Sequence, residues 1–171
     1  MTKRLDRDFY SRDVLDVAPE LLGKRLVRIG EDGGISSYLI TETEAYRGME
    51  DLACHASRGR TPRTKVMFGE GGYLYMYLIY GMYWMMNVVT GAEGVPQAVL
   101  FRGLREASGP GRLTRLIGLD GSFYGEDLVN SERIWIESNG PAPSYTAGPR
   151  VGIDYAGLPW KDMPWRFLMD L

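Results

Sequence analysis

The sequence contains very little cysteine and histidine, and it has no long apolar run. Its single cysteine, Cys54, can form no internal disulfide, so a reducing cytoplasm (the nucleoid, if bacterial) is the expected location. One cysteine and one histidine, His55, are too few for a zinc site, which needs several nitrogen or sulfur ligands. No stretch approaches the roughly 18 uninterrupted apolar residues of a membrane span. The opening letters, MTKRLDRDFY, show no secretory signal.

Internal repeats and long linkers are also missing, and 171 residues with 44% apolar content suit a single domain over residues 1–171. The pattern predicts an α+β fold with an antiparallel or mixed sheet, because strands outnumber helices and do not alternate regularly with them. Short helices are expected from Ser11, as the N-cap, to Ala18, and within 108–121 between Pro110 and Gly118. The expected strands are at 24–29, 37–48, 97–102, 133–138 and 165–171, with a hairpin at 71–91.

The charge of the chain is unevenly distributed. Residues 55–118 hold eight Arg or Lys against three acids, whereas both flanks are net acidic. Arginine dominates, and its guanidinium suits bidentate phosphate contacts. This pattern indicates a nucleic-acid surface, although an ordinary solvated face explains the same charges.

The strand SYLITETEAYRG (37–48) carries two glutamates near its end. At period two, Ile40, Glu42, Glu44 and Tyr46 share one face. A buried carboxylate is costly unless it is paired or used. The two acids either act together across a glycosidic bond, or one acts while the other is solvated or salt-bridged. We favour Glu44 as the acting group, because it lies nearer the point where the strand meets a loop.

The 71–91 hairpin places tyrosines on one face and aliphatic residues on the other. The tyrosine face is either a buried aromatic cluster or a stacking platform for a base or sugar. Its tip carries Tyr80, Met82 and Tyr83, and large apolar side chains at a solvent-facing tip suggest a wedge between base pairs.

The loop HASRGRTPRTK combines the only histidine with four cations, which are candidates to grip DNA phosphates: Arg58, Arg60, Arg63 and Lys65. Beside a tyrosine face, His55 offers a flat ring and a directional hydrogen bond, although a lone histidine is more often structural. Arg102 ends the apolar strand PQAVLFRG, which places its guanidinium in a partly buried site or in a structural salt bridge.

Four segments taken together resemble one family. They are ETEAY, HASRGRTPR, MFGEGGYLYMYLIYGMYWMMN and RVG, in this order along the chain. Their order and spacing are similar to those of the alkyladenine DNA glycosylases of the mammalian type, also called methylpurine or 3-methyladenine DNA glycosylases. The resemblance implies a compact α+β domain with a curved, mostly antiparallel sheet, short helices and a protruding hairpin, acting as a monomer without metal or other cofactor. The partner would be double-stranded DNA containing damaged purines.

The resemblance also implies catalytic roles for matched positions. Glu44 corresponds to the general base that activates the attacking water. Arg102 and the backbone carbonyl of Val151 would help to hold that water. Tyr80 corresponds to the tyrosine that fills the gap left by the flipped nucleotide. The connector between Glu106 and Ser108 is shorter than in many relatives.

The base pocket is implied in the same way. Tyr46 would stack on one face of the flipped base, and His55 with Tyr77 on the other. Tyr75 would support the pocket, and Asn87 would crowd the exocyclic amine of guanine. These matches predict a monofunctional glycosylase that leaves an abasic site, since no lysine lies in a matched catalytic position. A glycoside hydrolase acting on carbohydrate and a non-catalytic nucleic-acid-binding module are the alternatives.

Overall fold

The computed structural model describes residues 1–138 and 140–171. Three helices are α1 (Arg7–Tyr10), α2 (Val14–Glu20) and α3 (Pro110–Ile117). Ten strands are β1 (Lys3–Arg4), β2 (Arg25–Ile29), β3 (Ile35–Arg47), β4 (Leu74–Ile79), β5 (Tyr83–Thr90), β6 (Gln97–Leu104), β7 (Ala107–Ser108), β8 (Ile134–Ser138), β9 (Tyr145–Gly148) and β10 (Arg166–Met169). Short 3-10 turns are at His55–Arg58, Lys65–Phe68, Gly121–Phe123, Asp154–Ala156 and Trp160–Asp162.

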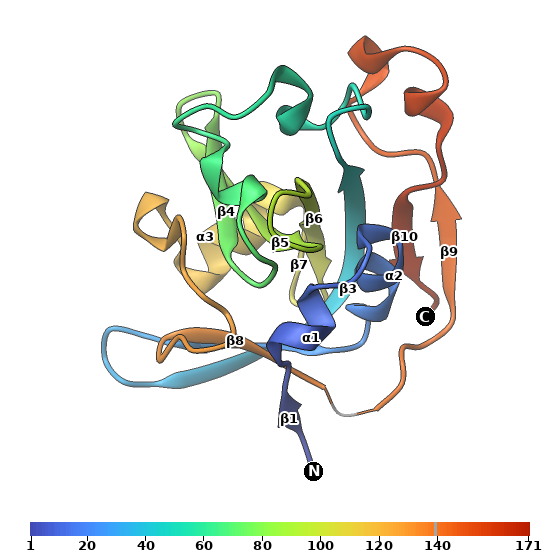
Figure 1. Ribbon diagram of the computed structural model, residues 1–171. Helices are drawn as coiled ribbons and strands as arrows, with labels where there is room; N and C mark the ends of the chain where they lie inside the picture. The colour runs from blue at the N-terminus through green and yellow to red at the C-terminus, as the bar shows by residue number, and fades with distance from the viewer. Residues whose placement is uncertain (139) are drawn as a thin grey trace.

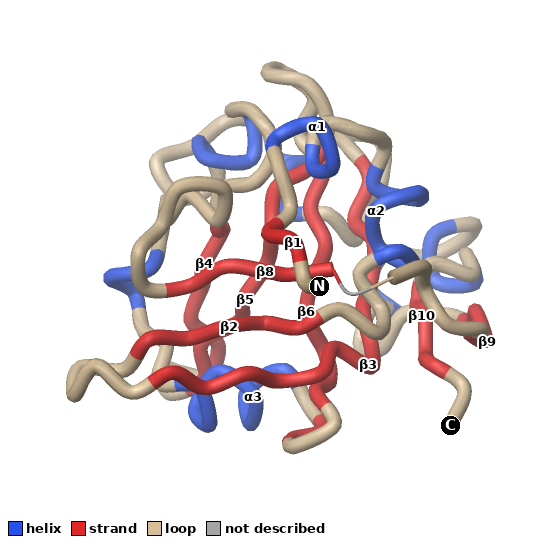
Figure 2. Tube along the Cα trace, turned by 90° about the horizontal axis from the view of Figure 1, so that it is seen from below, coloured by secondary structure: helices blue, strands red, loops and turns tan. Residues whose placement is uncertain are grey.

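All strands belong to one antiparallel sheet that is organised around β3. The main order is β1-β8-β2-β3-β6-β5-β4, with β10 also pairing with β3 and β9, and β7 pairing with β6. The first part of β3 pairs with β2, and its second part lies between β6 and β10. In Figure 2, β2 and β8 run across the direction of β4, β5 and β6. The curved antiparallel sheet with short helices confirms the predicted α+β class.

Helix α2 packs against β3 and β6, and α3 packs against β5 and β6 (Figure 1). Helix α3 follows its sequence signals, with Pro110 in its first turn and Gly118 ending it in the left-handed conformation. The predicted cap of α2 is wrong: Asp13 accepts from the Leu15 N–H as the N-cap, whereas Ser11 ends α1. No helix in the described ranges has the length and apolarity needed to cross a bilayer.

A β-bulge interrupts the pairing of β3 with β6 near Glu42. Ile40 and Ala45 both lie in the main hydrophobic core, although they are five positions apart, which in a regular strand places two side chains on opposite faces. The prediction that Ile40 shares the face of Glu44 is therefore wrong, because the bulge reverses the alternation of faces. Bulges of this kind redirect side chains next to functional sites.

The β4–β5 hairpin projects from the sheet as predicted. Its turn is closed by the Met82 N–H, which donates to the Ile79 carbonyl at 3.1 Å. Tyr80 (φ 51°) and Gly81 (φ 66°) both adopt positive φ, as the central residues of a type I′ turn do. Tyr80 is 86% exposed and Met82 57% exposed, so two large side chains face solvent at the tip.

Candidate active site

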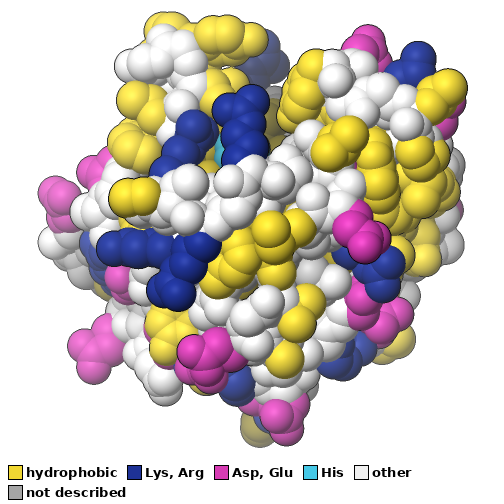
Figure 3. Space-filling model, turned by 45° about the horizontal axis from the view of Figure 1, so that its top comes forward, with side chains coloured by type: hydrophobic (Ala, Val, Ile, Leu, Met, Phe, Trp, Pro, Cys, Tyr) yellow, Lys and Arg dark blue, Asp and Glu magenta, His cyan; other side chains and the backbone are white. Residues whose placement is uncertain are grey.

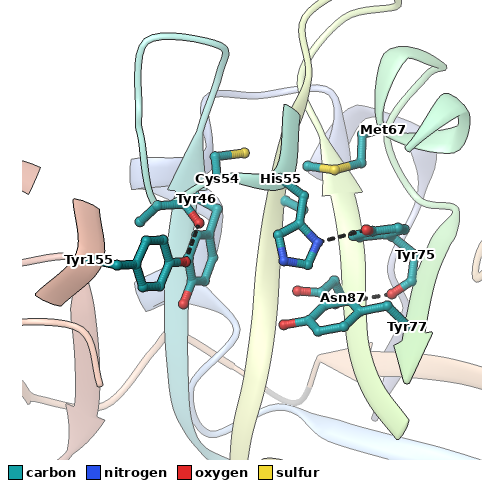
Figure 4. Close-up of a pocket in the computed structure, with 10 residues that line it drawn as sticks. Tyr46, Cys54, His55, Met67, Tyr75, Tyr77, Asn87 and Tyr155 are labelled. Carbon is teal, nitrogen blue, oxygen red and sulfur yellow. Dashed lines mark hydrogen bonds between the residues drawn. The ribbon is translucent and has the colours of Figure 1, made fainter. Parts of the chain in front are cut away.

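A hollow lies between the β4–β5 hairpin and the ends of β3 and the C-terminal loops. It holds about 340 Å³, including space open to solvent. Its lining contains four tyrosines: Tyr46, Tyr75, Tyr77 and Tyr155. Figure 4 shows Tyr46 and Tyr155 on one side, with His55, Tyr75 and Tyr77 on the other. In Figure 3, Lys and Arg side chains lie beside the histidine in the depression of this face.

The hairpin side of the hollow is a connected set of rings. The His55 Nδ1 lies 2.7 Å from the Tyr75 hydroxyl, and the ring centroids of His55 and Tyr77 are 4.5 Å apart. Burial lowers the pKa of His55 to about 4, and the nearby charges of Arg63 and Arg58 add to this shift. The imidazole is therefore neutral at pH 7 and offers a flat surface without positive charge.

Asn87 is held firmly in the same wall. Its Nδ2 donates to the Tyr75 carbonyl at 3.1 Å, and the residue is 3% exposed. Because the amide nitrogen is engaged, the side chain has a fixed orientation at the edge of the hollow. Cys54 also lines the hollow, and burial raises the pKa of its thiol to about 12, so it is protonated and unreactive.

Glu44 lies directly behind Tyr46 and is fully buried. One carboxylate oxygen accepts from the Tyr46 hydroxyl at 2.9 Å, and the other accepts from the Val151 N–H at 2.6 Å. Burial raises the pKa of Glu44 above the ordinary range, while Arg102, the Val151 N–H and the Tyr46 hydroxyl oppose the rise. Since a carboxylate has about four lone-pair positions, these two donors leave it the capacity to accept another hydrogen bond.

Arg102 connects the two glutamates. Its Nε lies 3.2 Å from Glu42, and its Nη1 lies 3.7 Å from Glu44. Glu42 also pairs with Arg166 at 2.8 Å. Glu42 is thus satisfied by two arginines, whereas Glu44 has one arginine, one hydroxyl and one backbone N–H. This difference favours a structural role for Glu42 and a chemical role for Glu44.

The basic loop forms the outer rim of the hollow. Arg58, Arg60, Arg63 and Lys65 are all exposed. Arg58 and Arg63 line a second depression that shares Cys54, His55 and Tyr155 with the first. The Arg63 guanidinium also lies 5.3 Å from the centroid of the Tyr77 ring. Positive charge therefore lies along one side of the entrance, where a polyanion would approach.

Comparison with known proteins identifies the family of the chain. A family model described as methylpurine-DNA glycosylase matches residues 8–107 and 103–170. A "Putative 3-methyladenine DNA glycosylase" of Desulfitobacterium hafniense is 44% identical, with 98% of this chain and 96% of the relative aligned. Proteins of the same name from Anaeromyxobacter and Legionella pneumophila are each 45% identical, with 98% and 96% of this chain aligned to 89% and 93% of theirs. The chain belongs to the methylpurine-DNA glycosylase family.

Membership makes this glycosylase a hydrolase of N-glycosidic bonds that serves base-excision repair. The structure brings most of the predicted site residues to one place, around the hollow and its rim. Tyr83 lies elsewhere: its ring packs on α3 beside Gly111, and the Arg115 guanidinium lies 5.6 Å from its centroid. Val151, predicted to hold the water through its carbonyl, also donates its N–H to Glu44. No group of three or more His, Cys, Asp or Glu that suits a metal occurs in the part of the glycosylase that the structure describes.

Two features of the glycosylase site escaped the sequence analysis. Tyr155 lines both depressions and is 72% exposed, although its hydroxyl donates to the Ala53 carbonyl at 3.3 Å. Arg150 is buried against Asp51, directly before Val151. Tyr155 is an isolated aromatic in a loop, and only the C-terminal fold brings it to the hollow. Arg150 lies within the RVG motif, and this motif was the sequence signal that could have identified it.

The neutral state of His55 has a measurable effect on stability. Its pKa is depressed in the folded glycosylase, so the unfolded chain takes up the proton first as the pH falls through about 6.5. The unfolding free energy of the wild type should therefore fall by on the order of 2–3 kcal/mol more than that of His55→Asn between pH 6.5 and 4. Denaturant titrations across this range test the difference. Parallel stability curves for the two proteins would contradict the burial of a neutral imidazole.

Proposed function

We propose that this glycosylase excises damaged purines of the 3-methyladenine, 7-methylguanine, hypoxanthine and ethenoadenine class from duplex DNA. Water activated by Glu44 hydrolyses the N-glycosidic bond and leaves an abasic site. The observation that carries the proposal is the buried carboxylate of Glu44, held beside an aromatic hollow by Tyr46, Val151 and Arg102. The names of the relatives mention 3-methyladenine, one member of this class.

The damaged nucleotide must first leave the stacked duplex, which costs a few kcal/mol and costs least for a poorly paired base. The exposed hairpin tip supports this step. Tyr80 and Met82 project into solvent and enter the vacated space. Phosphates on either side are held by the exposed cations of the basic rim, which makes binding strongly dependent on salt.

The hollow then holds the flipped base between Tyr46 on one side and His55 with Tyr77 on the other. An alkylated purine carries positive charge, and aromatic faces attract cations. A neutral His55 adds surface without repelling that charge. Asn87, fixed by its bond to Tyr75, stands where the exocyclic amine of guanine collides with it.

The chemical step develops positive charge at C1′ of the sugar. Ionised Glu44 stabilises this charge and takes a proton from water as the water attacks. Arg102 and the Val151 carbonyl hold the water on the side of the sugar opposite to the departing base. A 3-methyladenine or 7-methylguanine departs as a neutral base without protonation, so a single base suffices for these substrates. Hypoxanthine and ethenoadenine depart with the electron pair of the broken bond and take up a proton from the solvent.

The reaction stops at the abasic site. A lyase step needs an activated amine to form a Schiff base. No lysine lines either depression among the described residues, and Lys65 lies on the exposed rim. The chain acts as a monomer, and residues 1–171 form one catalytic domain.

A duplex with one labelled strand and a single 7-methylguanine, hypoxanthine or ethenoadenine tests the proposal. Incubation followed by alkali should break the strand at the lesion, whereas incubation without alkali should leave it intact. The same duplex without a lesion is the control. Breaks without alkali, or a covalent adduct trapped by borohydride, would show a lyase. A glycoside hydrolase or a simple binding module would give no breaks at all.

A further inference from the structure

Arg150 and Asp51 form an ion pair that is completely enclosed. Both side chains are 0% exposed, and the Arg150 Nη1 lies 2.6 Å from an Asp51 oxygen. The Arg150 Nη2 binds the second Asp51 oxygen at 2.9 Å, and Nη1 also donates to the Ala45 carbonyl at 3.0 Å. Ala45 stands between Glu44 and Tyr46, so this bond fixes β3 at the site.

The same guanidinium reaches two parts of the proposed chemistry. It lies 4.8 Å from the centroid of the Tyr46 ring, which holds that ring from the side of the protein interior. The residue that follows it, Val151, donates its N–H to Glu44 at 2.6 Å. One buried cation therefore orients both the stacking ring and the donor that fixes the carboxylate.

Stability alone gives a weak reason for such a pair. Removing two charges from water costs several kcal/mol per ion, and well-packed apolar residues often stabilise as much or more. Asp51 is anchored as well, since it accepts the N–H groups of Arg47 and Ala53. The pair thus fixes the end of β3, its following loop and the Arg150–Val151 backbone relative to one another.

We propose that Arg150, held by Asp51, is a positioning residue for base excision that sets the placement of Tyr46, Val151 and Glu44. The inference rests on the proposed role of Glu44. It extends that role to a buried side chain that touches neither the substrate nor the water.

Several charged and polar groups face Glu44 from the elements packed around it. Arg102 comes from β6, the Val151 N–H and Arg150 from the segment before Gly152, and the Tyr46 hydroxyl from β3 itself. On β10, Arg166 lies opposite Glu44 in register but pairs with Glu42. From β4, the Tyr77 hydroxyl lies across the hollow. Among these groups, Arg150 and Arg102 are the two cations whose charge lowers the pKa of Glu44.

Two variants separate the geometry of Arg150 from its charge. Arg150→Lys keeps a cation but loses the planar fork that binds Asp51 and lies over Tyr46. We expect its maximal single-turnover rate on 7-methylguanine duplex to fall by on the order of 10- to 100-fold, with the acidic limb of the pH–rate profile unmoved.

The double variant Asp51→Asn/Arg150→Met leaves no unpaired charge. It should lose rate at least as strongly, and its acidic limb should move to higher pH, because Glu44 then lacks one of its cations.

Arg7→Lys is the matched control. Arg7 pairs with Asp127 at 2.7 Å, donates to the Gly71 carbonyl and lies 4.9 Å from the Tyr73 ring centroid, away from the hollow. It should lower the melting temperature while leaving the rate and the pH profile unchanged.

Folded Arg150 variants with the wild-type rate and profile would overturn the inference, as would failure of even Arg150→Lys to fold. Glu44→Gln, measured in parallel, separates the two ideas: normal cleavage by that variant refutes the proposed function itself.

Discussion

Glu44→Gln is expected to bind lesion-containing DNA normally and to cleave it on the order of 10²- to 10⁴-fold more slowly, the range typical of a lost general base. Glutamine fits the space of glutamate. Its oxygen can accept from the Val151 N–H, and its amide can donate to the Tyr46 hydroxyl, which rotates to accept it. The fold and the hollow should survive, while the charge that stabilises C1′ and accepts the proton of water is gone.

Single-turnover rates and binding isotherms at one stated salt concentration check this expectation. Glu126→Gln is a matched control, because Glu126 is a partly buried carboxylate paired with Arg133 outside the hollow. Its rate should equal that of the wild type. Glu42→Gln should show a smaller loss than Glu44→Gln, since Glu42 acts on the site only through Arg102. If Glu42→Gln were inactive and Glu44→Gln fully active, the assignment of the base would be reversed.

Replacing Tyr80 by asparagine should slow excision from duplex DNA by roughly 10- to 100-fold, because the ring no longer offsets the few kcal/mol of lost stacking. Asparagine tolerates positive φ, and Asn-Gly is the pair that type I′ turns favour. The hairpin turn should therefore keep its shape while losing its wedge. The same lesion in a single strand needs no extrusion from a stack, so its excision should change little.

The ratio of the rates on duplex and on single-stranded substrate is the quantity to measure. Ile35→Asn is the matched control: Ile35 is 71% exposed and starts β3 in a different hairpin. It should leave both rates unchanged. Equal losses of Tyr80→Asn on the two substrates would mean that Tyr80 contributes to the pocket rather than to extrusion.

Local sequence signals predicted most of the fold and failed where backbone geometry departed from regularity. Pro110 and Gly118 placed α3, and the alternating tyrosines placed β4, because both signals act over a few residues. The face of Ile40 was wrong because a bulge depends on the partner strand β6, which period-two reasoning does not include. The cap of α2 was wrong because Asp13 and Ser11 are equally suitable cap residues by type.

For the site, the sequence motifs named the residues but not their contacts. Two contacts join segments more than 100 residues apart: the Tyr155 hydroxyl with Ala53, and the Val151 N–H with Glu44. No short sequence pattern encodes contacts of this kind. Tyr83 was predicted to belong to the wedge because it lies near the turn in the sequence. Its ring turns instead toward α3, since Gly111 leaves room for it there.

The backbone of Glu44 has hydrogen-bonded strands on both sides, with Leu100 opposite it on one and Arg166 on the other. A strand in the interior of a sheet is among the last parts of a protein to open. At the hairpin tip, by contrast, Tyr80 and Met82 are exposed to solvent. We therefore expect substitutions at the tip to change how the protein enters a duplex while the backbone of Glu44 stays in place.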